Sequence, residues 1–359
     1  MKNRIWILVA SVIFMACTHD VENEAVPIEV INWNSIKKAD AEKLFCDTLT
    51  DYILLKTTNQ NQLFGRIDKI KLCNDRIYIS DNRMRALVVY DMNGVGIANV
   101  GTVGQGPKEF LSITDFDVDS LGNIYVLDGR LDKLLVYDDN FVCIKEKKLP
   151  FEADILKVLG NSQMLFGLSS WNKGKAEGKK IVVTDETPEV CREYFKYTDA
   201  VDPAYWISGY CFGESDAHIA YNQTVCNDVY LFDKTGDLEK IFRFDFGEEN
   251  VLDADKTDIE RKLPNYDKYT MLKKILAVTD KYIIGFLWEH RKTRMFMFDY
   301  VSNICYLGKE FSDYDRRPGC GFCEDGIISY MDSENELCPD TVNAHLRNEG
   351  FVLKIQSVK

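Results

Sequence analysis

Short apolar runs separated by polar turns recur at a nearly constant interval along most of the chain. The segment DRIYISDNRMRALVVYDMNG (75–94) aligns without gaps on GNIYVLDGRLDKLLVYDDNF (122–141), so that identical residues such as Tyr78 and Tyr125 are 47 positions apart. Fainter copies end in Asp185, Asp233 and Asp299, and the last copy is GIISYMD followed by GFVLKI. The runs are rich in β-branched and aromatic residues and are bounded by turn formers, which predicts β-strands.

A repeat of 40 to 50 residues built from short strands is typical of β-propeller blades. Each blade has two apolar faces that its neighbours must cover, so the blades close into a ring. The count predicts an all-β, six-bladed β-propeller with four-stranded blades. The last blade lacks a fourth strand after 351–355, whereas DYILLKT (51–57) precedes the first blade. We therefore expect Tyr52 to Lys56 to be the outer strand that closes the last blade.

Two segments depart from the strand pattern. Residues 252–276 place apolar side chains at helical spacing with a break at Pro264, which predicts a helical insertion between blades four and five. The stretch VGTVGQGPKEF (100–110) is rich in glycine, but a strand rather than a helix follows it, so it lacks the helix N-terminus of a phosphate loop. We expect it to connect blades one and two, with Phe110 filling the space between them.

The N-terminus has the pattern of an export signal. Lys2 and Arg4 precede an apolar run over 5–15, which is shorter than the roughly 20 residues of a membrane span. The sequence FMAC (14–17) resembles a lipoprotein signal-peptidase site, which predicts a signal peptide over 1–16, a lipidated Cys17 and tether over 17–45, and the propeller over 46–359. A buried N-terminal helix is the alternative. The expected location is the cell envelope, as an outer-membrane lipoprotein facing the periplasm or the surface.

The net charge of the chain restricts the classes of partner that it is expected to bind. The net charge is −13, and it becomes −15 once residues 1–16 are removed. Such a chain is not expected to bind nucleic acid or anionic lipid, so the membrane link would come from acyl chains on Cys17. The pair Cys320 and Cys323 has the Cys-x-x-Cys spacing of redox sites, but its flanks lack a helix start, which favours a local disulfide or two free thiols.

The second repeat carries a family resemblance. GQGPKEFLSITDFDVDSLGNIYVLDGRLDKLLVYD (104–138) resembles an NHL-type propeller repeat. With the lipoprotein start, the chain resembles the 6-bladed β-propeller lipoproteins of Gram-negative gut anaerobes, which have NHL-type or TolB-like repeats. The resemblance implies a fold rather than an activity. Some NHL-like propellers are metal-dependent hydrolases or lyases at the mouth of the central channel, and this is the alternative function.

Several acidic residues are candidates for a metal or catalytic site. Asp115, Asp117 and Asp119 share one side of a strand and could bind a cation in the channel, but Ser120 and Val126 depart from the calcium-loop pattern. Asp119 fits turn chemistry better, as do the repeated Asp81 and Asp128. His218, His290 and His345 show no ligand spacing. We expect no catalytic residue, metal or cofactor.

Basic and aromatic residues concentrate in one class of loop. In a propeller the turns between second and third strands share a face with the connections between blades. We predict a ligand face there, formed by Arg83, Arg85, Arg130, Trp171, Tyr205, Trp206, Arg291, Arg316 and Arg317, near Lys133, Lys173 and Trp288. Arginine binds carboxylates and sulfates through two N–H groups, and aromatic rings stack on sugars. The expected ligand is an acidic glycan, an acidic peptide or an envelope protein. The alternative is that these cations pair with neighbouring acids.

Overall fold

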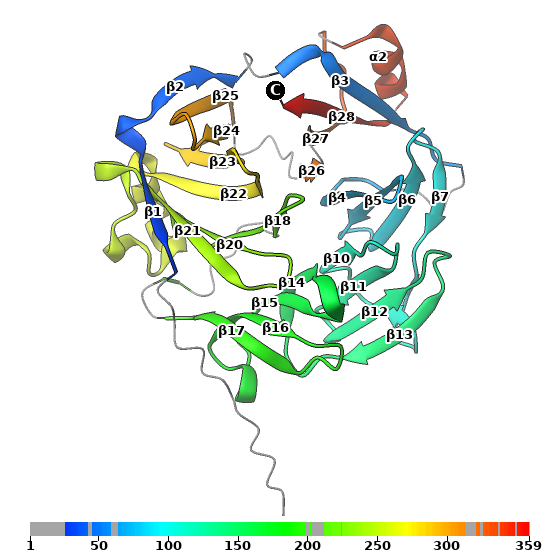
Figure 1. Ribbon diagram of the computed structural model, residues 1–359. Coiled ribbons are helices and arrows are strands. Elements are labelled where there is room, and N and C mark those ends of the chain that lie inside the picture. The colour runs from blue at the N-terminus through cyan, green and yellow to red at the C-terminus, as the bar shows by residue number, and fades with distance from the viewer. Residues whose placement is uncertain are drawn as a thin grey trace, which may run out of the picture.

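Six β-sheets surround a central channel in the computed structural model (Figure 1). The structure describes residues 26–41, 45–58, 64–198, 201–202, 212–223, 225–312, 321–323, 326–336, 338–348 and 350–358. Each sheet is one blade, and its strands follow one another outward from the channel. The all-β, six-bladed propeller with four-stranded blades is confirmed. No helix among these residues has the length and apolar character needed to cross a membrane.

The blades follow one another along the chain. Blade one contains β4 (Lys69–Cys73), β5 (Arg76–Asp81), β6 (Ala86–Asp91) and β7 (Gly96–Asn99). Blade two contains β10 (Asp115–Val118), β11 (Ile124–Asp128), β12 (Lys133–Tyr137) and β13 (Cys143–Lys148). Blade three contains β14 (Ala153–Val158), β15 (Met164–Leu168), β16 (Lys179–Thr184) and β17 (Val190–Lys196). Blade four contains β18 (Gly213–Glu214), β19 (Ile219–Asn222), β20 (Asp228–Phe232) and β21 (Leu238–Asp245). Blade five contains β22 (Thr270–Val278), β23 (Tyr282–Glu289), β24 (Lys292–Asp299) and β25 (Ile304–Ser312).

The two ends of the chain meet in blade six. Its strands are β26 (Gly321–Cys323), β27 (Gly326–Met331), β28 (Phe351–Val358) and β3 (Phe45–Leu55). The antiparallel register of the outer pair places Leu353 opposite Ile53 and Phe351 opposite Leu55. The N-terminal strand therefore closes the last blade, as the sequence predicted.

Two further strands lie inside the segment predicted as a tether. β1 (Ile28–Asn32) adds to β21, and β2 (Lys37–Asp40) adds to β25, both in parallel. Between them, η1 (Trp33–Ser35) carries Trp33, which is 2% exposed and packs on Phe244 and Phe246. Blades four and five thus have five strands, and the boundary predicted at residue 46 lies too late in the chain.

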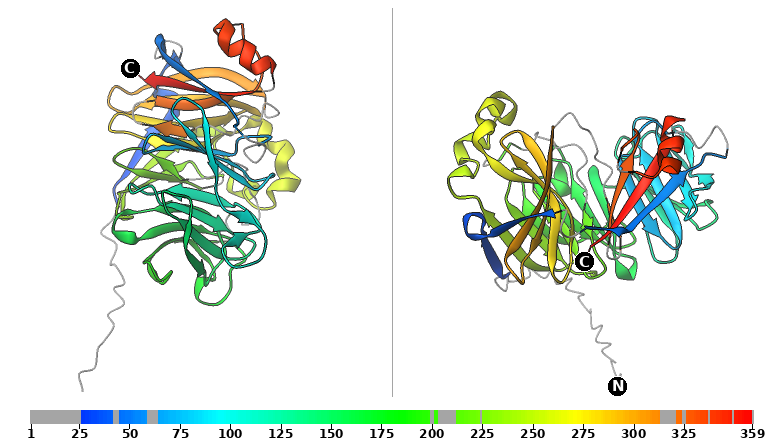
Figure 2. Two further views of the ribbon diagram at one scale, coloured as in Figure 1. Left: turned by 90° about the vertical axis from the view of Figure 1, so that its right-hand side faces the viewer. Right: turned by 90° about the horizontal axis from the view of Figure 1, so that it is seen from above.

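Besides single 3-10 turns, namely η1, η4 (Gly160–Ser162), η5 (Gly174–Ala176) and η6 (Gly247–Glu249), two longer helical segments lie outside the strands in the described part of the chain. The insertion between blades four and five is confirmed, but it is limited to η7 (Asp253–Asp255), α1 (Ile259–Lys262) and η8 (Leu263–Lys268), because residues from Thr270 onward form β22. A second helix, α2 (Asp340–Arg347), lies between β27 and β28 and was not predicted. Both segments lie on the same side of the ring, whereas the C-terminus lies on the other (Figure 2).

The repeated aspartates are explained by the turns between third and fourth strands. The carboxylate of Asp138 accepts hydrogen bonds from the N–H groups of Asn140 and Val142, at 3.1 and 2.8 Å. Asp91 and Asp233 accept from the residues two and four positions later in the same way. Asp185 does the same in blade three, so blades one to four each use a carboxylate that satisfies two turn amides, which is why it recurs at the repeat interval.

Asp81 and Asp128 have the predicted turn role and also hold the incoming connection. Asp128 is fully buried and accepts hydrogen bonds from Leu111 N–H at 2.6 Å and Ser112 Oγ at 2.7 Å, besides the N–H of Arg130 in its own turn. Asp81 binds the N–H groups of Gly65 and Met84 in the corresponding positions. Each carboxylate therefore ties a second-to-third turn to the connection that enters its blade.

The glycine-rich loop turns the chain between blades one and two, as predicted. Gly101 has a φ of +72°, and a side chain there would collide with the Tyr137 hydroxyl. The carboxylate of Glu109 accepts a hydrogen bond from Gly106 N–H at 2.8 Å and fills the space beside the neighbouring glycines. Phe110 is 1% exposed among apolar residues of both blades. The space beside the glycines, where a phosphate loop would hold its ligand, is therefore occupied by the side chain of Glu109 from the same loop.

Candidate functional site

The alternating strand directions give the ring two distinct faces. The second-to-third turns and the connections between blades lie on one face, called the connection face here. The first-to-second and third-to-fourth turns lie on the opposite face, called the turn face. Both helical segments belong to connections on the connection face (Figure 2). The two candidate sites described below lie on different faces.

The connection face presents unpaired arginines from neighbouring blades. Arg83 and Arg85 lie in the turn between β5 and β6, and Arg130 lies in the equivalent turn of the next blade, 47 residues after Arg83. All three are exposed, and their guanidinium groups make no ion pair within the described part of the chain. Met84 between the first two is 51% exposed. The N–H donors of these three guanidinium groups are therefore left for a ligand or for water.

Blade three adds an exposed tryptophan that is held in place. Trp171 is 59% exposed, and its indole N–H donates to the Glu152 carboxylate. The next residue, Asn172, accepts a hydrogen bond from Glu152 N–H at 2.8 Å and donates to the carbonyls of Glu152 and Ser169. These bonds fix the loop, so the exposed ring loses little conformational freedom when something stacks on it.

Other residues predicted for the ligand face have internal partners. Arg291 lies in the corresponding turn of blade five and forms an ion pair with Asp267 of the helical insertion. Lys133 pairs with Glu146 at 2.7 Å. Trp288 packs against the insertion, with Lys273 over its ring. These contacts fit the alternative that surface cations pair with nearby acids, whereas Arg83, Arg85 and Arg130 do not follow it.

Several predicted positions lie outside the described residues. They are Cys17, Tyr205, Trp206, Arg316, Arg317 and Cys320. Cys323 is described in β26, where it lines the central channel.

The second candidate site is a cavity in the central channel. It has a volume of about 720 Å³ and is lined by residues of all six innermost strands. Its wall also includes residues of the first-to-second turns, among them Asp75, Ser120 and Asp216, so it opens toward the turn face. The inner strands of blades four and six are only two and three residues long. Short inner strands leave room for this cavity beside the longer ones.

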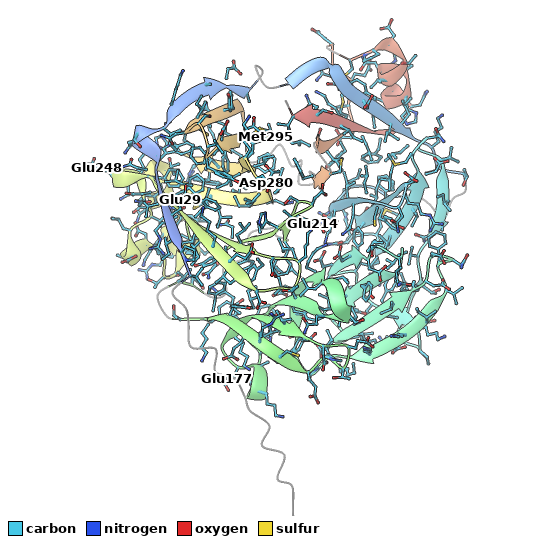
Figure 3. All side chains as sticks on the ribbon, viewed as in Figure 1. Glu29, Glu177, Glu214, Glu248, Asp280 and Met295 are labelled. Carbon is cyan, nitrogen blue, oxygen red and sulfur yellow. The ribbon has the colours of Figure 1, made fainter. Side chains whose placement is uncertain are left out.

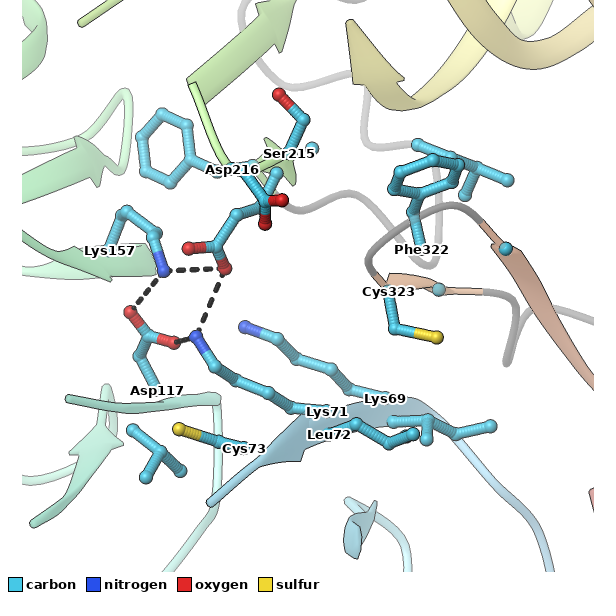
Figure 4. Close-up of a pocket in the computed structure, with 18 of the residues that line it drawn as sticks. Lys69, Lys71, Leu72, Cys73, Asp117, Lys157, Ser215, Asp216, Phe322 and Cys323 are labelled. Carbon is cyan, nitrogen blue, oxygen red and sulfur yellow. Dashed lines mark hydrogen bonds and ion pairs between the residues drawn. The ribbon is translucent and has the colours of Figure 1, made fainter. Parts of the chain in front are cut away.

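Lysines and carboxylates meet on one side of this cavity (Figure 4). Asp117 of β10 binds Lys71 of β4 at 2.5 Å and Lys157 of β14 at 2.8 Å. Glu214 of β18 binds the same two ammonium groups at 3.0 and 2.7 Å. Figure 3 shows Glu214 on the inner side of the ring, whereas Glu177 and Glu248 lie at its outside. The network joins blades one, two, three and four.

The network is charged. Burial raises the pKa of Asp117, but Lys157 and Lys71 outweigh it and hold the pKa well below the usual range. Burial likewise opposes the charge of Glu214, yet Lys157 and Lys71 lower its pKa to about 2. For Lys71, burial lowers the pKa, and Asp117 and Glu214 reverse this to a net increase. Both carboxylates are therefore ionised at neutral pH.

Ammonium groups and backbone amides occupy the carboxylate oxygens of the candidate cation ligands Asp115, Asp117 and Asp119. Asp115 binds Lys69 at 2.7 Å and Leu156 N–H at 2.8 Å. Asp119 accepts from the N–H groups of Leu121 and Asn123, which is the predicted turn chemistry. Among the described residues, no group of three His, Cys, Asp or Glu side chains has the arrangement of a metal site. This arrangement does not favour the alternative of a metal-dependent hydrolase or lyase.

The fold and the two faces define a six-bladed β-propeller with a lysine-lined channel. Residues 30–343 match the model of the family described as domain of unknown function DUF4934, and the chain belongs to this family. No curated protein matches the chain.

Three solved structures show the same fold at low identity. A candidate exported protein from Bacteroides fragilis is 15% identical, with a TM-score of 0.71 over 92% of this chain and 99% of its own. A DUF4221 family member from Bacteroides vulgatus is 9% identical, with a TM-score of 0.54 over 86% and 96% of the two chains. A streptogramin B lyase is 11% identical, with a TM-score of 0.50 over 89% and 100%. These likenesses establish the fold alone.

Proposed function

We propose that this protein is a non-catalytic binding propeller of the cell envelope, anchored through lipid on Cys17, whose connection face holds an acidic glycan, an acidic peptide or an envelope protein. The observation that carries the proposal is that Arg83, Arg85 and Arg130, which have no ion-pair partner among the described residues, share the connection face with the fixed, exposed ring of Trp171. An envelope location is supported by the signal-like N-terminus and by the exported character given to the Bacteroides fragilis structure.

The chemistry of this face selects its ligand. A guanidinium group binds a carboxylate or sulfate through two parallel N–H donors, and such bonds are stronger than neutral ones. An exposed aromatic ring stacks on a sugar ring or an apolar side chain. Because arginines come from two successive blades and the tryptophan from the third, the ligand is expected to be extended and to carry at least two negative groups. In a protein with net charge −13, this local positive surface also orients an acidic partner.

The binding face is tested by the variant Arg83→Gln/Arg130→Gln/Trp171→Ala. Each arginine contact to a charged ligand is worth roughly 1.5–3 kcal/mol, so affinity should fall at least about 100-fold. Acidic glycan arrays and pull-downs from envelope extracts would identify the ligand, and titration calorimetry would give the affinities. A matched control is Lys145→Gln/Lys281→Gln/Leu121→Ala, which removes two cations and one exposed apolar side chain elsewhere on the surface. If both triple variants bind every detected ligand equally well, the proposed face is wrong.

The lipid anchor is tested by Cys17→Ser. A serine accepts no thioether-linked lipid, so the variant should leave the membrane fraction and no longer incorporate an alkyne-labelled fatty acid. The wild-type protein should remain in the membrane after a high-salt wash, because acyl chains rather than charges hold it there. Equal membrane retention of the two proteins would contradict the anchor without affecting the ligand face.

A further inference from the structure

We propose that the central channel is a second binding site, distinct from the connection face, which takes a small organic monocarboxylate whose carboxylate group replaces that of Glu214 on Lys71 and Lys157. The proposal goes beyond the function assigned to the connection face and does not depend on it. It is based on the charge, the donor capacity and the shape of the cavity.

The charge of the inner wall favours an anion. Among the cavity-lining residues that belong to the innermost strands, the lysines are Lys69, Lys71, Lys157 and Lys274, and the acids are Asp117 and Glu214. The rest of the lining is acidic on balance, with Asp51, Asp68, Asp75 and Asp216 against Arg76 and Lys234, so the excess of positive charge is confined to the innermost strands. The protein as a whole has a net charge of −13. Lysine is rarely buried without a partner, so its concentration inside an acidic protein needs a specific reason.

The two central lysines retain donor capacity. An ammonium group has three N–H donors. Lys71 uses two of them on Asp117 and Glu214, and Lys157 uses two on the same carboxylates. Within the residues that the structure describes, neither group has a further partner. Their side chains are 14% and 7% exposed and lie at the cavity wall.

The two carboxylates differ in how firmly they are held. The side chain of Asp117 is 2% exposed and also accepts a hydrogen bond from Val158 N–H at 2.8 Å. The side chain of Glu214 is 36% exposed, lies on a strand of two residues and contacts only ammonium groups, including that of Lys234 at 3.4 Å. Glu214 is therefore the carboxylate that an external one can replace, because it leaves without breaking a backbone hydrogen bond.

The remaining walls limit the ligand. A volume of about 720 Å³ lies within the range of small-molecule sites. Leu72, Phe212 and Phe322 supply apolar surface, and Figure 4 shows Phe322 across the cavity from Lys71. Asp75 and Asp216 line the turns at the mouth, where a ligand with several negative charges meets more repulsion than a monocarboxylate does. One carboxylate on an apolar or weakly polar body fits this arrangement better than a polyanion does.

The site is tested by calorimetry on the chain from residue 18 onward at fixed ionic strength. The probes are phenylacetate, glucuronate, the neutral phenylacetamide and inorganic phosphate. Wild-type protein should bind at least one carboxylate, at least 10-fold tighter than phenylacetamide or phosphate. Glu214→Gln removes the internal competitor and keeps its shape, so the affinity of that carboxylate should increase at least 10-fold.

Further variants separate this site from the connection face. Adding Lys71→Gln to Glu214→Gln should reverse the increase, with folding checked by circular dichroism. The triple variant of the connection face should bind the carboxylate as wild type does. No carboxylate binding at 10 mM by either wild type or Glu214→Gln would overturn the proposal. The proposal would also be overturned if wild type bound phenylacetamide as tightly as the carboxylates, or if Glu214→Gln bound the carboxylate more weakly than wild type does.

Discussion

Trp33→Ala is expected to lower the free energy of unfolding by about 3–5 kcal/mol, the usual range for removing a large aromatic side chain from a packed core. Trp33 is 2% exposed and has ring contacts to Phe244 at 6.4 Å and Phe246 at 5.2 Å between centroids. It lies between β1 and β2, so its loss also weakens the two strands that cover the outer edges of blades four and five. Chemical denaturation followed by tryptophan-independent far-UV circular dichroism measures the effect.

Three further variants test whether the loss of stability in Trp33→Ala comes from the buried position of Trp33 and from the strands β1 and β2 beside it. Trp171→Ala removes the same side chain from an exposed position and should change stability by no more than about 0.5 kcal/mol. Trp33→Phe should recover part of the loss. Deleting residues 18–41 should be at least as damaging as Trp33→Ala and should promote aggregation, because it uncovers the edges of β21 and β25. If the deletion were as stable as the complete chain, β1 and β2 would have no structural role.

Lys157→Met is expected to destabilise the ring by about 3 kcal/mol, at the lower end of the range for breaking a buried ion pair. The change leaves Asp117, with a side chain 2% exposed, to Lys71 alone and removes a 2.7 Å partner from Glu214. Adding Asp117→Asn should restore part of the stability, since the uncompensated charge is then gone. Lys145→Gln is the control, because its pair with Glu186 spans 3.9 Å between side chains that are more than half exposed.

The effect of Lys157→Met should depend on pH. The pKa of Glu214 is lowered to about 2 and that of Asp117 lies below its usual range, whereas unfolded carboxylates titrate near about 4. Their stabilisation is therefore complete above about pH 4.5 and is lost as the pH falls toward 2. Denaturation at pH 7, 5, 4 and 3 should show the difference between wild type and variant shrinking below pH 4. A constant difference down to pH 3 would contradict the charged network.

Local interactions within each repeat explain where sequence-based prediction succeeded. Asp91, Asp138 and Asp233 satisfy amides two and four residues away, so the same local requirement repeats in the sequence and gives the blade count. The missing strand of blade six follows from the same count. The glycine-rich loop was assigned correctly because the strand after it is visible in the local pattern.

The helices and the N-terminal strands show where local patterns are insufficient. The turns of α1 and η8 were expected to continue to residue 276, but Met271 and Leu272 are buried in a sheet that only the neighbouring strands define. Residues 28–40 contain strand formers such as Ile28, Val30 and Ile31, but they lie among polar residues and outside the blade repeat. They form strands because β21 and β25 offer open edges, and those edges exist only once the ring has formed.

The sequence by itself determined that this is a ring of six similar blades closed by its own N-terminal segment, because the residues that make one blade recur within short stretches of the chain. Only the tertiary structure decided which charges meet. Lys71, Asp117, Lys157 and Glu214 lie on four strands and span 143 residues of sequence, and the curvature of the ring brings each ammonium group within 3.0 Å of both carboxylates. The same curvature pairs Arg291 with Asp267, whereas Arg83 and Arg130 have no acidic partner among the residues that the structure describes.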